Sequence, residues 1–70
     1  MNTMLDTILD EIAQFECERG GRKPRLLRLP TWDALDLVKE RADVYPTLDD
    51  VTLIDGVAIE RGGTRRELVA

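Results

Sequence analysis

The chain has 70 residues, a formal net charge of -4 and 43% hydrophobic residues. This length accommodates one small domain, and the acidic balance disfavours nonspecific nucleic-acid binding by the molecule as a whole. The chain contains no histidine and no serine, which excludes Ser-His and Cys-His catalytic pairs and removes the commonest zinc ligand. We therefore expect a protein that is not an enzyme and needs no cofactor.

A single cysteine, Cys17, excludes an internal disulfide and favours a reducing compartment. No apolar run approaches the roughly 18 residues of a membrane span. Asp6, Asp10 and Glu11 interrupt the apolar core that a signal peptide needs. We expect a cytoplasmic location. On the first predicted helix Cys17 lies away from the apolar stripe, and the carboxylates beside it disfavour the reactive thiolate.

The N-terminal segment predicts a helix over residues 4–19. Thr3 and Asp6 are spaced as in a capping box, and Gly20 and Gly21 supply a left-handed stop. The apolar residues recur at helical spacing and define the buried stripe: Leu5, Ile8, Leu9, Ile12 and Phe15.

The next segment is the most basic in the chain. Its members are Arg22, Lys23, Arg25 and Arg28, preceded by Arg19. One interpretation is an anion contact, with a phosphate or an acidic partner. The other is a solvated loop that balances the acidic helix beside it. Only one aromatic residue, Trp32, lies nearby, so no base-stacking platform is indicated and the solvated loop is favoured.

Residues 25–29 predict a strand, with Leu27 and Leu29 on one face and Leu26 and Arg28 on the other. Pro30 lacks a backbone donor, which ends the strand.

A second helix is predicted over residues 32–42, with Thr31 as N-cap. Its expected core stripe consists of Ala34, Leu35, Val38 and Ala42. Trp32 and Leu37 fall beyond opposite edges of that stripe. We expect Trp32 either to cover the edge of the core or, like Leu37, to anchor a protein partner.

The last third of the chain predicts a hairpin. Thr47 and Asp50 are spaced to begin a single helical turn. Asp55-Gly56 then joins two β-branched runs, 51–54 and 57–61, as a type I′ turn that pairs Ile54 with Val57 and Thr52 with Ile59. The spacing of Asp49, Asp50 and Asp55 does not match a calcium loop, so no metal site is expected.

Gly62-Gly63 offers a second turn, after which residues 64–69 either return antiparallel to 57–61 or fray. In the paired form Val57 lies opposite Leu68 and Glu60 opposite Arg65. Together the elements predict a single α+β domain over residues 1–70. We expect a two-layer sandwich, with two helices on one face of a small mixed sheet, in the order α-β-α-β-β with a possible extra C-terminal strand.

Several of these residues carry a family resemblance. Gly21, Lys23-Pro24, Leu27, Leu29, Trp32 and Leu35, followed by Asp55-Gly56-Val57-Ala58-Ile59, resemble the order of motifs in small uncharacterised proteins of tailed phages and prophages. The resemblance covers about two thirds of the chain and includes no catalytic motif. It implies a viral or mobile-element origin, a location in the host cytoplasm or the virion, and a structural or host-directed binding role.

These observations favour a non-catalytic protein–protein interaction module that binds a protein partner or itself through Trp32, Leu37 or an edge strand. A small acidic inhibitor of a host defence or nucleic-acid enzyme, anti-CRISPR-like in character, is the main alternative. In that alternative Asp6, Asp10, Glu11 and Glu18 face a basic groove. Nucleic-acid binding through the basic segment and catalysis by paired aspartates are less favoured, and no small-molecule substrate or membrane contact is expected.

Overall fold

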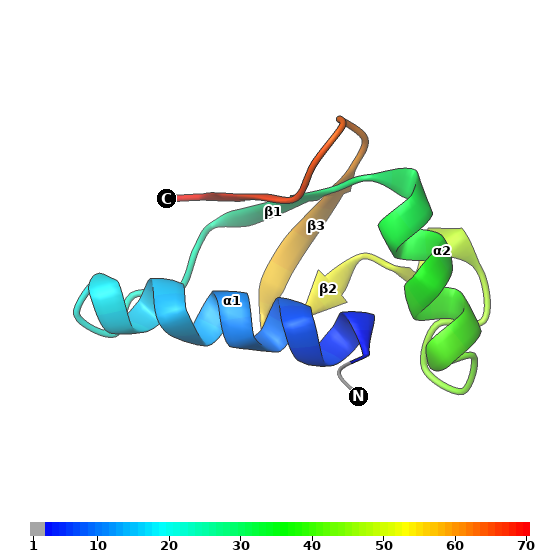
Figure 1. Ribbon diagram of the computed structural model, residues 1–70, viewed down its shortest axis with the longest axis horizontal. Coiled ribbons are helices and arrows are strands. Elements are labelled where there is room, and N and C mark those ends of the chain that lie inside the picture. Colours follow the sequence, from blue (N-terminus) through cyan, green and yellow to red (C-terminus); the bar gives the residue numbers. More distant parts are fainter. Residues whose placement is uncertain (1–2) are drawn as a thin grey trace.

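The chain folds into two helices, one helical turn and a four-stranded sheet (Figure 1). The computed structural model describes residues 3–70. In chain order the elements are α1 (Met4–Glu18), β1 (Leu26–Leu29), α2 (Thr31–Glu40), the 3-10 turn η1 (Leu48–Asp50), β2 (Leu53–Ile54), β3 (Val57–Arg61) and β4 (Glu67–Val69). Both helices lie on the same side of the sheet, which confirms the predicted α+β sandwich.

α1 begins and ends close to the predicted residues. The Thr3 hydroxyl accepts a hydrogen bond from the Asp6 N–H at 3.1 Å and closes the expected capping box. Two further backbone donors of this helix end, those of Met4 and Leu5, donate to the Glu40 carboxylate of α2. The first helix is therefore capped partly from within and partly by the second helix.

The sheet is mixed, with the strand order β2-β3-β1-β4. β1 and β3 are parallel, as the long connection between residues 29 and 51 allows. β2 and β3 form the predicted hairpin, with Ile54 opposite Val57. Its turn has positive φ at both Asp55 (50°) and Gly56 (78°), as a type I′ turn requires.

The C-terminal strand does not pair as expected. β4 is antiparallel to β1, with Leu68 opposite Leu27, so the predicted pairing of Leu68 with Val57 is wrong. The reason is that β3 has no free edge: β2 occupies one side and β1 the other. The segment after Gly62 therefore passes across the end of β1 and pairs with its open edge.

The core lies between the inner face of the sheet and the two helices. Its buried apolar side chains are Ile8, Ile12, Leu27, Leu29, Ala34, Leu37, Tyr45, Val51, Ile54 and Val57. β1 alternates as predicted, because Leu27 and Leu29 are buried whereas Arg28 is exposed. This single-sided burial leaves the opposite face of the sheet without a covering layer.

The second helix is rotated relative to the prediction. It caps at Pro30 rather than Thr31, and its buried residues are Asp33, Ala34 and Leu37. Leu35 is 41% exposed, and Ala42 lies beyond the helix in an exposed position. The predicted stripe follows apolar residues alone, whereas the buried face of the helix includes Asp33.

Leu37 is fully buried, so its predicted role as a partner anchor is wrong in this fold. The structure buries the face that carries Asp33 because Arg66 offsets the charge of that carboxylate.

Candidate interaction surface

The face of the sheet turned away from the helices carries a row of apolar residues. Backbone register places Leu53 beside Ala58, Ala58 beside Leu26, and Leu26 beside Val69. This row, here called the outer row, crosses all four strands. Leu53 is 56% exposed. The solvent-exposed face of a sheet normally carries polar residues. An apolar row across the whole width of that face therefore indicates a surface that contacts another molecule.

A charged row runs beside the outer row, two residues further along β1. Glu60, Arg28 and Glu67 lie side by side on β3, β1 and β4. The Arg28 guanidinium lies 3.6 Å from the Glu60 carboxylate, and both side chains are about half exposed. The outer face therefore combines an apolar centre with a polar border, which is the usual layout of a protein interface.

Trp32 is 56% exposed at the start of α2, and Leu35 follows three residues later, on a neighbouring part of the helix surface. The expectation that Trp32 covers the edge of the core is not met at this level of exposure. Its other predicted role, as an anchor for a partner, stays a prediction.

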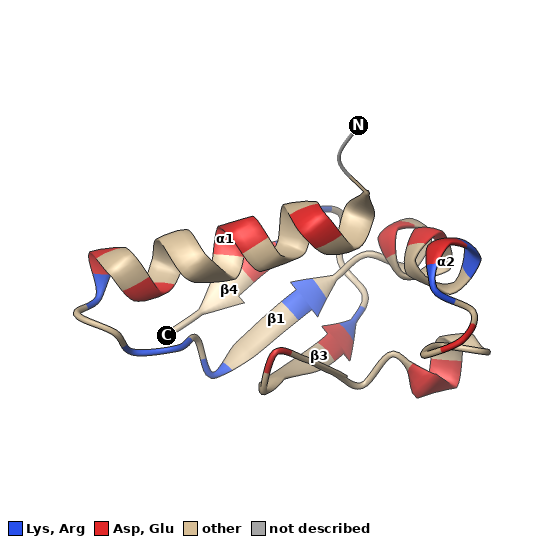
Figure 2. Cartoon of the chain, turned by 90° about the horizontal axis from the view of Figure 1, so that it is seen from below, with Lys and Arg blue, Asp and Glu red and all other residues tan. Residues whose placement is uncertain are grey.

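The predicted basic segment is dispersed by the fold. Lys23 donates to the Asp55 carbonyl oxygen at 2.7 Å and lies 3.3 Å from the Asp55 carboxylate. Arg28 pairs with Glu60 on the outer face. Figure 2 shows the Lys and Arg positions of this segment along the α1–β1 connection and on β1. Of the predicted anion contacts, Arg22 and Arg25 are exposed and form no ion pair with another residue of the described segment 3–70.

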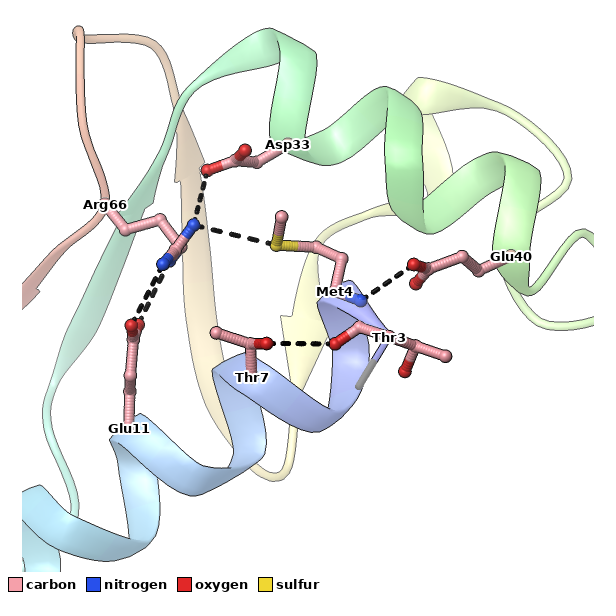
Figure 3. A network of polar contacts seen from close by, with 7 residues as sticks. All are labelled: Thr3, Met4, Thr7, Glu11, Asp33, Glu40 and Arg66. Carbon is pink, nitrogen blue, oxygen red and sulfur yellow. Dashed lines mark hydrogen bonds and ion pairs between the residues drawn. The ribbon is translucent and has the colours of Figure 1, made fainter. Parts of the chain in front are cut away.

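A polar cluster, which sequence reasoning missed, joins three elements (Figure 3). Arg66, just before β4, donates to both carboxylate oxygens of Glu11 on α1, at 3.1 and 3.0 Å. The same guanidinium donates to Asp33 on α2 at 3.1 Å. Asp33 is only 7% exposed, so Arg66 supplies the charge that its burial needs.

Hydrogen bonding to Glu11, followed by that to Asp33, raises the pKa of Arg66 above its ordinary value. Each nitrogen of the Arg66 guanidinium donates to a carboxylate of the cluster, and one of them also donates to the Met4 sulfur. The guanidinium is therefore used within the protein rather than directed at a ligand. The arrangement fixes the C-terminal strand against both helices. We interpret the cluster as structural.

Two signals in the sequence pointed to these features. Asp33 lies one residue from Ala34 and four from Leu37, at the helical spacing of a buried face. Leu26 and Val69 alternate with the buried Leu27 and the partly buried Leu68, which places them on the outer face once the strand pairing is known. The pairing itself is a tertiary property, so the outer row was not accessible from local patterns.

No family model, curated protein or solved structure matches this chain. Within residues 3–70, no helix has the length and apolarity required to cross a bilayer. Over the same residues, no three side chains among His, Cys, Asp and Glu gather where they could hold a metal ion. Cys17 is exposed, as its position on the helical wheel predicted.

Proposed function

We propose that this chain is a small, non-catalytic protein–protein interaction module that binds its partner through the outer face of the sheet. The outer row carries the proposal, because it places apolar side chains from all four strands on a face that neither helix covers. Exposed apolar area with a polar border favours association with another protein surface.

The size of the outer row bears on the kind of partner. Four adjacent strands span only roughly 15 Å, and stable interfaces bury about 800 Å² on each partner. Two copies that met only through this row would bury too little surface for a stable dimer. A different protein that reaches past the row toward a sheet edge or Trp32 satisfies the requirement, so a heterologous partner is favoured over self-association.

The resemblance to small proteins of tailed phages and prophages supports an accessory or structural role in such a system. The proposed role requires no catalytic residue. The polar cluster around Arg66 stabilises the scaffold that presents the outer row.

The proposal is tested by comparing variants in affinity purification from the source cells. Leu53→Glu places a charge in the outer row, and Val44→Glu is the matched control because Val44 is 51% exposed in the α2–η1 connection. We expect proteins that co-purify with the wild type to be reduced at least fivefold by Leu53→Glu and to be unchanged by Val44→Glu. Equal recovery with both variants would overturn the role of the outer face.

The second candidate function, inhibition of a host enzyme through acidic mimicry, has one favourable observation. α1 exposes Asp6, Asp10 and Glu18 and has no basic residue in its last turn. Glu11, the fourth acidic residue expected on that surface, is instead paired with Arg66 at 3.0 Å. This function predicts that Asp6→Lys and Asp10→Lys abolish binding to the host enzyme and that the binding weakens steeply as salt is added. Both results together would favour it over the outer-face role.

A further inference from the structure

A groove of about 280 Å³ lies between α1 and β4, away from the outer row. Phe15 and Leu68 supply its apolar surface, and Glu18 and Glu67 are among its other lining residues. The Glu11–Arg66 ion pair is also part of the wall. α1 therefore forms one side of the groove and the C-terminal strand forms the other.

The strand beside this groove is an open edge of the sheet. β4 pairs only with β1 and occupies one end of the strand order. The backbone groups on its far side have no strand to pair with among the described elements. Such an edge is a template for an added strand from another chain.

The charges around the groove favour a basic occupant. Its charged lining residues are Glu11, Glu18, Arg66 and Glu67, and the guanidinium of Arg66 is already shared between Glu11 and Asp33. Glu18 and Glu67 are exposed, and Glu18 accepts a hydrogen bond only from the neutral amide of Gln14 within residues 3–70. Arg19 lies over the Phe15 ring, 4.6 Å from its centroid, at the far end of α1. Glu18 is therefore the carboxylate of this wall that no cation among residues 3–70 pairs with, because the Glu67 side chain lies on the outer face beside Arg28.

We propose that the β4 edge and this groove bind an extended segment of the partner protein that alternates apolar and basic side chains. Side chains of an added strand point alternately to the two faces. On the outer face, apolar residues extend the outer row beyond Val69. On the groove side, the aliphatic stem of a lysine or arginine covers Phe15 and Leu68 while its charge meets Glu18. This inference deepens, and rests on, the proposed interaction function.

The direct test is an NMR titration of the ¹⁵N-labelled chain with a seven-residue peptide that alternates valine and lysine and has blocked termini. We expect saturable shifts in the amides of residues 67–69 and of the Phe15–Glu18 turn. Glu18→Lys should weaken the binding at least fivefold. Asp36→Lys, the same charge change at an exposed α2 position, should alter it less than twofold.

Two further peptides separate the backbone and charge contributions. A peptide with glutamate in place of lysine should bind at least tenfold more weakly, because it meets the carboxylates with like charge. A peptide with N-methylated backbone amides at alternate positions should lose the shifts at residues 67–69, because it lacks the donors for strand addition. Absence of binding at millimolar peptide, shifts that exclude β4, or equal effects of Glu18→Lys and Asp36→Lys would overturn the inference.

The failure of this inference is distinguishable from failure of the proposed function. If the peptide does not bind while Leu53→Glu still removes co-purifying proteins, the outer face functions without the β4 edge. If the peptide binds but Leu53→Glu and Val44→Glu purify the same proteins, the groove is supported and the outer-face role is overturned.

Discussion

The guanidinium of Arg66 lies 3.1 Å from the carboxylate of Asp33, across a separation of 33 residues in the chain. Asp33 is the one charged residue in the buried set of the described chain, and this contact lets α2 turn its Asp33 face inward. The same ion pair therefore determines which face of α2 is buried and where the C-terminal strand lies.

Arg66→Met should destabilise the fold by about 2–3 kcal/mol, because it leaves the Asp33 carboxylate buried without a compensating charge. Urea unfolding at pH 7 measures the effect. Arg65→Met is the control, since Arg65 is exposed, and its change should stay within about 0.5 kcal/mol. Equal midpoints for the two variants would mean that the cluster contributes nothing to stability.

Two leucines of α2, two residues apart, test which face of the helix is buried. Leu37→Ala should lower the free energy of unfolding by about 3 kcal/mol, because it opens a cavity at a fully buried position. Leu35→Ala removes the same atoms from a residue that is 41% exposed and should cost less than about 1 kcal/mol. Thermal unfolding of both variants gives the comparison, and a reversed order would contradict the observed rotation of the helix.

The hairpin turn depends on Gly56, whose φ of 78° is unfavourable for residues with a Cβ. A Cβ at this position meets only the Lys23 Nζ atom, at an ordinary contact distance of 3.7 Å. Gly56→Ala should therefore cost about 1 kcal/mol through backbone strain rather than through a clash. Denaturant unfolding checks this value against Thr52→Ala in the same hairpin, for which a smaller change is expected.

Asp43 and Arg41 form an exposed pair after α2, with 3.1 Å between the Arg41 Nε and the Asp43 Oδ1. The hydrogen bond from Arg41 lowers the pKa of Asp43 below its ordinary value of 3.8. A lowered folded-state pKa gives stability that is present above the unfolded pKa and is lost as pH falls through the folded one. Carboxyl ¹³C NMR should show the Asp43 midpoint rising in Arg41→Gln; an unchanged midpoint would exclude the pairing in solution.

Local patterns were sufficient for much of the fold. The capping box at Thr3, the alternation of Leu27 and Leu29, and the Asp55-Gly56 turn each depend on neighbours within a few residues, and each was predicted. These features require no knowledge of distant contacts.

The predictions that were wrong concern features that depend on residues distant in the sequence. Leu37 was placed outside the core because the burial of Asp33 depends on Arg66, far along the chain. β4 was paired with β3 because a two-glycine turn favours a hairpin, whereas β1 had already taken that edge. The outer row and the groove could not be predicted from local patterns for the same reason, since both depend on where β4 lies.

The most direct measurement of the central claim is photo-crosslinking in the source cells. A photoreactive phenylalanine analogue replaces Leu53 in the outer row or, as the control, Val44 in the α2–η1 connection; both native side chains are just over half exposed. The account predicts a discrete adduct with a different protein from position 53 and none from position 44. Adducts of equal yield from both positions, or none from position 53, would contradict the assignment of the outer face as the interaction surface.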